Sequence, residues 1–147
     1  MAALNILLVE DSQSWQRILQ EKIRQALLGW TSPSNIRVVE QFEEAWEALN
    51  QEKPWHLLIT DIGLTYPESR QKLGKQLVEC AGDLQIPTIV VSGTPVLSKQ
   101  EVGDLITEHK ARAFFSKEEF DGKKFATKIR KILQIEEPQS VHQSSLG

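Results

Sequence analysis

Several short apolar stretches of this sequence end in side chains that can do chemistry. The acidic pair Glu10 and Asp11 follows the first stretch, and Asp61, Ser92 and Lys117 stand at the ends of three later ones. Singly, each has an ordinary explanation, because acids favour helix N-termini, serines occur in turns and lysines are mostly solvated. Together they supply three carboxylates, a hydroxyl and an ammonium group, which is a chemically complementary set.

The elements that must position these side chains alternate along the chain. Apolar runs bounded by turn residues predict strands, and apolar residues at helical spacing predict helices. We expect strands over 5–9, 35–39, 57–60, 86–91 and 111–116, helices within 12–28, 42–49, 73–82, 102–109 and 125–133, and a loop over 63–69. This alternation predicts an α/β domain with a five-stranded parallel sheet covered on both faces, in the doubly wound flavodoxin-like (βα)5 order. The carboxyl ends of parallel strands share one edge, where ligands bind.

Length and composition set the class of protein. The 147 residues fit one domain over 1–134 and a Glu-, Pro-, Gln- and Ser-rich tail over 135–147 that we expect to be disordered. The net charge of −3 gives no reason to expect direct nucleic-acid binding. Cys80 has no partner for an intramolecular disulfide, and no leader or membrane span is evident. These features predict a cytoplasmic protein that does not insert into membranes.

The clustered side chains favour phosphoryl chemistry. Two or three carboxylates provide the oxygen ligands and negative charge that hold Mg²⁺. Asp61 can then attack phosphorus and form an acyl phosphate. Phosphoryl transfer needs positioning and positive charge around the equatorial oxygens, which Mg²⁺ and Lys117 would supply. The hydroxyl of Ser92 could donate a hydrogen bond to the new phosphoryl group.

Four motifs together resemble a known family, the receiver domains of two-component response regulators. They are the segments 6–12 (ILLVEDS), 58–61 (LITD), 90–93 (VVSG) and 115–117 (FSK), and the resemblance covers residues 5–133. It implies that Asp61 accepts a phosphoryl group from a histidine kinase or histidine phosphotransfer protein. It also implies Mg²⁺ held by Glu10, Asp11, Asp61 and the backbone carbonyl of Gly63, with Asp11 a direct ligand and Glu10 acting through water.

The resemblance further implies a switch and a readout surface. Ser92 would move toward the phosphoryl group, and Phe114, three residues before Lys117, would rotate inward; a purely structural role for Phe114 in its strand stays open. The added charge would bias a two-state element. The expected docking face for a downstream protein effector comprises 102–109, Phe114 and the last helix. The chain would then be a single-domain response regulator, a phosphorylation-dependent switch or phosphorelay carrier that catalyses only its own phosphorylation and dephosphorylation.

The sequence departs from the family pattern in three places. Glu118 follows the lysine where a proline with a cis bond is usual, which leaves the geometry of the next loop open. The stretch between Asp61 and Gly74 is about five residues longer than usual by comparison with the family, and it could shield the site, select the donor or be inert. No output domain follows the last helix. Gly63 and Thr94 border the site and could tune the lifetime of the phosphorylated state.

Two other functions remain open. A receiver-like docking module would work without phosphate, but such a module has no chemical reason to keep all five side-chain types. A phosphatase of the haloacid dehalogenase type uses a similar inventory, and residues 61–65 faintly resemble its nucleophile loop. In that superfamily, however, the nucleophile precedes the acidic pair, whereas Glu10 and Asp11 precede Asp61 here. Labelling by acetyl phosphate with Mg²⁺ separates the first alternative from a response regulator.

Overall fold

The computed structural model describes residues 3–30, 33–51, 54–61, 68–93 and 111–135 of the chain. Within these ranges, side chains are described for all residues except 68–73. The expected helix within 102–109, the residues Gly63 and Thr94, most of the long loop after Asp61 and the tail from 136 onward lie outside the described residues. No helix in the described ranges is long and apolar enough to cross a membrane.

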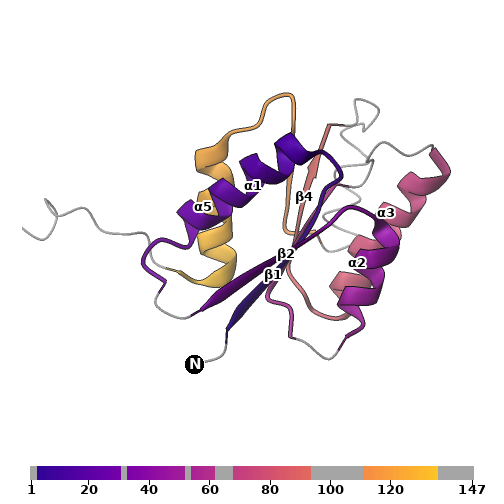
Figure 1. The fold of residues 1–147 in the computed structure, drawn as a ribbon, viewed down its shortest axis with the longest axis horizontal. Coiled ribbons are helices and arrows are strands. Elements are labelled where there is room, and N and C mark those ends of the chain that lie inside the picture. The colour runs from indigo at the N-terminus through magenta and orange to yellow at the C-terminus, as the bar shows by residue number, and fades with distance from the viewer. Residues whose placement is uncertain (1–2, 31–32, 52–53, 62–67, 94–110, 136–147) are drawn as a thin grey trace, which may run out of the picture.

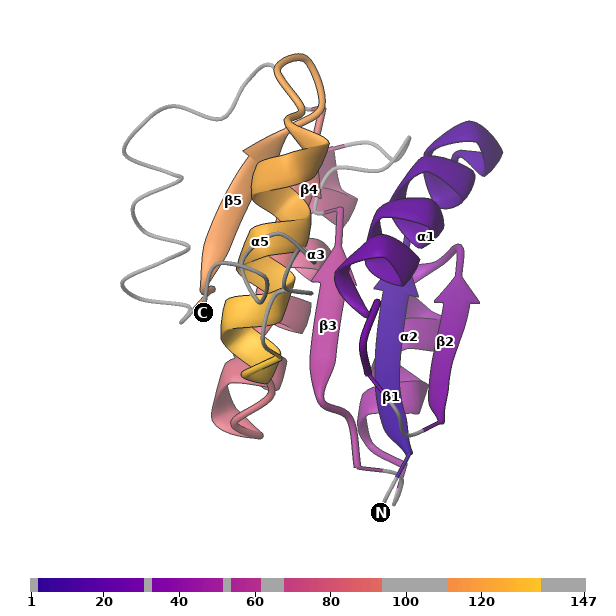
Figure 2. The same ribbon diagram turned by 90° about the vertical axis from the view of Figure 1, so that its left-hand side faces the viewer.

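The core of the fold is a five-stranded sheet in the order β2-β1-β3-β4-β5. All neighbouring strands are parallel, so their carboxyl ends lie at one edge (Figure 2). This is the doubly wound order that the sequence predicts. The strands are β1 (Leu4–Val9), β2 (Ser34–Val39), β3 (Leu57–Thr60), β4 (Thr88–Ser92) and β5 (Ala113–Ser116).

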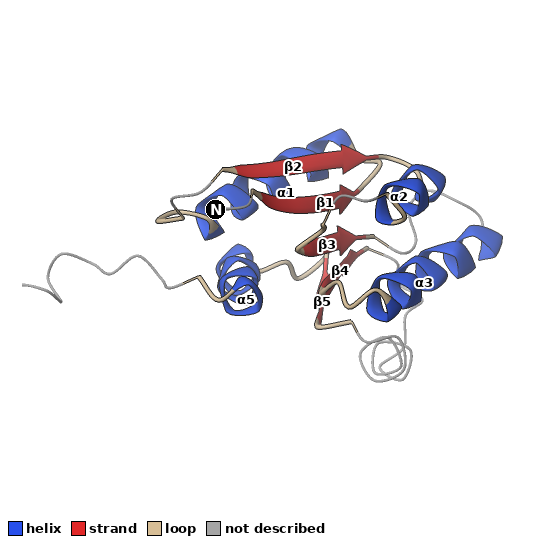
Figure 3. Cartoon of the chain, turned by 90° about the horizontal axis from the view of Figure 1, so that it is seen from below, coloured by secondary structure: helices blue, strands red, loops and turns tan. Residues whose placement is uncertain are grey.

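The described helices cover both faces of the sheet (Figures 1 and 3). Helices α1 and α5 lie on one face, and α2 and α3 lie on the other. Right-handed crossovers between parallel strands produce this two-sided arrangement. The helices are α1 (Gln13–Ala26), α2 (Phe42–Leu49), α3 (Glu68–Asp83) and α5 (Gly122–Leu133).

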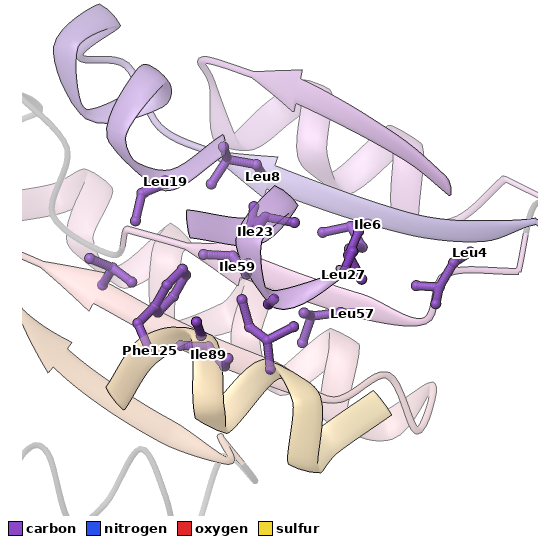
Figure 4. Packing of buried hydrophobic residues seen from close by; sticks show 14 of the residues in the cluster. Leu4, Ile6, Leu8, Leu19, Ile23, Leu27, Leu57, Ile59, Ile89 and Phe125 are labelled. Carbon is purple, nitrogen blue, oxygen red and sulfur yellow. The ribbon is translucent and has the colours of Figure 1, made fainter. Parts of the chain in front are cut away.

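Burial explains why β1, β3 and β4 lie at the centre of the sheet. Most of their residues are apolar, and every residue of these three strands is buried. A strand covered by helices on both sides requires apolar side chains throughout rather than alternation. One face packs against α1 and α5, where Leu19, Ile23 and Phe125 contact side chains of the sheet (Figure 4).

Two helices begin with side-chain caps at the edge of the sheet that carries the candidate site. The hydroxyl of Ser12 accepts a hydrogen bond from the backbone N–H of Trp15 and caps α1. The carboxylate of Asp121 accepts hydrogen bonds from the backbone N–H groups of Lys123 and Lys124 and caps α5. Both caps fix a helix start close to a strand end, so they limit the freedom of the connecting loops.

Some expected boundaries are wrong by one to five residues. Helix α3 already includes Glu68 and Ser69, which the breaker-rich composition placed in the loop. Strand β4 begins at Thr88 rather than at 86, since Pro87 has no N–H to donate to a ladder. At the other end of the chain, the packed core extends to Ile135, which is buried against it, one residue beyond the expected domain boundary.

Candidate functional site

The backbone positions the candidate site residues one step beyond the ends of the strands. The N–H of each of three charged residues donates a hydrogen bond to a carbonyl oxygen of the neighbouring strand. These bonds run from Glu10 to Val39 (3.0 Å), from Asp61 to Val9 (3.1 Å) and from Lys117 to Ser92 (3.0 Å). The ladder of the sheet therefore continues through these residues, so their backbones are held as firmly as the strands.

The ammonium group of Lys117 lies between two carboxylates. Its Nζ is 2.8 Å from Asp61 Oδ2 and 2.6 Å from Glu10 Oε1. The carboxylates are almost completely buried, since Glu10 is 0% and Asp61 5% exposed. A buried charge is costly unless it is paired, so these three groups stabilise one another by an ion-pair network rather than by hydration.

The two oxygens of the Asp61 carboxylate have different partners. Oδ2 accepts from Lys117, and Oδ1 accepts a 3.0 Å hydrogen bond from the hydroxyl of Ser92. Ser92 is buried at the end of β4, between the strands that carry the other two residues. The carboxylate is therefore held at both oxygens by donors from neighbouring strands, which fixes the orientation of a nucleophile.

Glu10 is held differently by its two oxygens. Oε2 accepts a 3.0 Å hydrogen bond from the backbone N–H of Ser12. Oε1 forms the ion pair with Lys117, but the contact lacks hydrogen-bond geometry, and no other hydrogen bond reaches this buried atom. Burial raises the pKa of Glu10 above its usual value, and the contacts with Lys117 and Ser12 only partly oppose this effect.

The pKa of Lys117 is also raised, by its acidic neighbours. Burial by itself lowers the pKa of this ammonium, but the hydrogen bond to Asp61 and the negative charges of Asp61 and Glu10 outweigh burial. Lys117 therefore stays protonated at neutral pH and provides a permanent positive charge beside Asp61. This positive charge can attract an incoming anionic group and stabilise it beside Asp61.

The carboxylate oxygens at this edge of the sheet are the type of ligand that a hard divalent cation prefers. Glu10, Asp11 and Asp61 follow the adjacent strands β1 and β3, and these three carboxylates exceed the charge of the Lys117 ammonium by two, which a cation could balance. The buried Glu10 Oε1, which lacks a hydrogen bond, could accept one from a metal-bound water. Within the described ranges, no three His, Cys, Asp or Glu side chains are arranged as a ready metal site. The expected fourth ligand, Gly63, lies outside those ranges.

Phe114 lies on β5, on the opposite sheet face from α5. It is half-buried and packs against a small cluster of Val78, Val90 and Ala111. The expected inward rotation of this ring is not tested by a single conformation. Of the expected docking face, β5 and α5 are described, whereas 102–109 lies outside the described part of the chain.

Two residues at the site have roles that the sequence did not reveal. Trp15, in the first turn of α1, has its ring centroid 5.2 Å from Lys117 Nζ. Gly93 lies beneath the stem of Lys117, since a Cβ at this position would be 3.2 Å from Lys117 Cδ. Proximity to a strand end was the available signal for both residues.

Comparison with solved structures identifies the fold. A response regulator receiver protein from Pseudomonas putida is 22% identical, with a TM-score of 0.68 over 89% of this chain and 98% of that one. The signal receiver domain of an HD domain-containing protein from Pseudomonas fluorescens Pf-5 is 19% identical, with a TM-score of 0.68 over 97% and 90%. The chain has the receiver-domain fold.

A third structure with the receiver fold was determined with a phosphate mimic. It is the isolated REC domain of RcsB from Salmonella enterica serovar Typhimurium in the presence of BeF3−, which is 17% identical, with a TM-score of 0.60 over 88% of this chain and 90% of that one. Neither a protein-family model nor a curated protein matches the sequence. The relationship to receiver domains is therefore evident in the fold.

Proposed function

We propose that this chain is a response regulator that accepts a phosphoryl group on Asp61. The observation that carries the proposal is the geometry of the Asp61 carboxylate, which receives donors from Ser92 and Lys117 at the carboxyl edge of a receiver fold. An oriented carboxylate beside a permanent positive charge is suited to attack a phosphorus atom. A docking module without phosphoryl chemistry would not need this arrangement.

The proposed reaction transfers one phosphoryl group. A carboxylate oxygen of Asp61 forms a bond to phosphorus, and the bond from phosphorus to the donor breaks, with its electron pair leaving on the donor. A phosphohistidine donor loses a P–N bond, and acetyl phosphate loses a P–O bond. Lys117 stabilises the negative charge on the transferring oxygens, and Ser92 can donate a hydrogen bond to one of them.

Mg²⁺ is part of the proposal because of the charge at the site. Asp11 and Asp61 would hold the cation directly, and Glu10 would act through a bound water. When bound, Mg²⁺ supplies positive charge to the phosphoryl oxygens and reduces repulsion between the carboxylates and an anionic donor. Glu10 is already engaged by Ser12 and Lys117, which favours the indirect role for it.

We further propose a histidine kinase or histidine phosphotransfer protein as the donor. A downstream protein effector would dock on the face that includes Phe114 and α5. In this role the chain cycles between two states and turns over no external metabolite. The proposal also places the protein in the cytoplasm, where such donors act.

The test is intact-protein mass after incubation with acetyl phosphate and Mg²⁺. We expect a single phosphoryl adduct that requires Mg²⁺ and is absent from Asp61→Asn. Asp83→Asn, which alters an exposed carboxylate at the end of α3, is the matched control and should be labelled like the wild type. An unlabelled wild type, under conditions that label a known receiver domain, would instead support the docking module. Continuous phosphate release without an adduct would support a phosphatase.

A further inference from the structure

The ammonium group of Lys117 has a third neighbour besides its two carboxylates. The indole ring of Trp15 lies 5.2 Å from Nζ, within the distance at which an aromatic face attracts a cation. One N–H of the ammonium donates a hydrogen bond to Asp61, and Glu10 forms a close ion pair with it at 2.6 Å. The ring therefore adds an aromatic neighbour to the two carboxylates that already attract this ammonium.

The ring of Trp15 is itself held in place by aromatic contacts. Phe120, in the turn before α5, meets it edge to face, with centroids 5.4 Å apart and an interplanar angle of 87°. Phe120 also contacts Phe125, at 5.3 Å between centroids, and Phe125 is fully buried in the core. The position of Trp15 is thus fixed from α5 as well as from its own helix.

We propose that Trp15 is a positioning residue that holds the Lys117 ammonium at the site during phosphoryl transfer. This inference rests on the proposed function. In the unphosphorylated protein, Asp61 and Glu10 both attract Lys117. Once an Asp61 oxygen bonds to phosphorus, that oxygen loses its full negative charge, and the ammonium must move to a phosphoryl oxygen.

Trp15 favours this exchange for a physical reason. Glu10 forms no bond to phosphorus in this reaction and would draw the flexible lysine stem toward itself. The ring attracts the ammonium as a whole and does not require one N–H to point at a single acceptor atom. It also excludes water from one side of the ion pair. Trp15 thereby keeps Lys117 close to the reacting oxygens while its anionic partner changes.

A packing role alone would make a different prediction. Trp15 also packs at the edge of the main core cluster, so its removal could lower stability without affecting transfer. Trp15→Leu retains an apolar side chain but removes the π-system, whereas Trp15→Phe retains a weaker one. Trp46→Leu is the matched control, because Trp46 is 43% exposed on α2, on the other face of the sheet.

The first measurement is the rate of adduct formation over a range of acetyl phosphate concentrations, with Mg²⁺ present. For Trp15→Leu we expect the rate at saturating donor to fall about tenfold, with a smaller fall for Trp15→Phe. The donor concentration for half-maximal rate and the rate of Trp46→Leu should stay close to wild type. A folded Trp15→Leu that reacts at the wild-type rate would overturn the inference.

The second measurement is made on the wild-type protein, and the conservative variant serves only to assign its signals. In the ¹⁵N-labelled wild type, the indole N–H signals report each tryptophan separately, and Trp15→Phe assigns one of them. On addition of BeF3− and Mg²⁺, we expect the Trp15 signal to shift and the Trp46 signal to stay. An unchanged Trp15 signal in a protein that does form the phosphoryl adduct would refute the role of Trp15 but leave the proposed function standing. A wild type that forms no adduct would refute the proposed function and this inference with it.

Discussion

Lys117 Nζ lies 2.8 Å from Asp61 Oδ2, although the two residues are 56 positions apart in the chain. They follow β5 and β3, and β4 lies between these strands with Ser92 at its end. Three adjacent strand ends therefore meet at one carboxylate. This arrangement is the centre of the proposed phosphoryl site and also a buried ion pair, so the same substitutions should affect both chemistry and stability.

Removal of the lysine charge should destabilise the protein. Lys117→Met would leave Glu10 and Asp61 as neighbouring buried carboxylates without a cation, and we expect the free energy of unfolding to fall by about 3 kcal/mol. Urea unfolding at pH 7 measures this change. Lys123→Met, an exposed position on α5, is the control and should have almost no effect. A Lys117→Met protein as stable as the wild type would contradict the proposed energetic role of the ion pair.

Removal of the Ser92 hydroxyl should have a smaller effect. Ser92→Ala leaves Asp61 Oδ1 with one donor fewer, and we expect a loss of about 1 kcal/mol in the free energy of unfolding. The phosphoryl adduct should still form, at a lower rate. Ser92→Thr keeps the hydroxyl and should retain both the stability and the adduct rate of the wild type. Ser116→Ala is the control, since Ser116 pairs with Ser92 in the sheet register but does not contact Asp61. Equal adduct rates for the Ser92→Ala and wild-type proteins would exclude a role for the hydroxyl in transfer.

The raised pKa of Glu10 predicts how stability depends on pH. The folded protein binds this proton more tightly than the unfolded chain, whose carboxyl titrates near 4.5. The stabilisation from protonated Glu10 is therefore complete below pH 4.5 and is lost as the pH rises through the folded-state pKa. Glu10→Gln does not titrate at this position.

The measurement is urea unfolding of the wild type and Glu10→Gln at several pH values from 4 to 8. We expect the stability of the wild type relative to the variant to decrease as pH rises above 4.5. A relative stability that increases over this interval would show that contacts with Lys117 and Ser12 dominate over burial of the Glu10 carboxylate.

The cap of α5 makes an independent prediction about the turn that follows Lys117. Asp121→Ala removes hydrogen bonds to two backbone N–H groups, and we expect a loss of about 1 kcal/mol in the free energy of unfolding. Glu119→Ala, an exposed acid in the same turn, controls for the change of charge. If the two variants lose the same stability, the effect comes from charge rather than from the cap.

The sequence alone was sufficient for the topology of the sheet. Continuous apolar runs such as 57–60, separated by helical periodicity, leave few arrangements once crossovers must be right-handed. The same rule predicted that Asp61, Ser92 and Lys117 would share an edge, because a parallel sheet aligns its carboxyl ends. Boundaries such as the start of α3 at Glu68 were less predictable, since breaker residues are also tolerated in a first helical turn.

Only the tertiary structure decided how the side chains at that edge are paired. The family resemblance distinguished Glu10 from Asp11 only by how each would hold Mg²⁺, whereas the structure shows Glu10 buried, bonded to the Ser12 N–H and paired with Lys117. Nothing in the sequence indicated that Trp15 would face the same ammonium, because that contact depends on the distance between α1 and β5. Strand order follows from local patterns and chain connectivity, whereas side-chain partners depend on packing between residues remote in sequence.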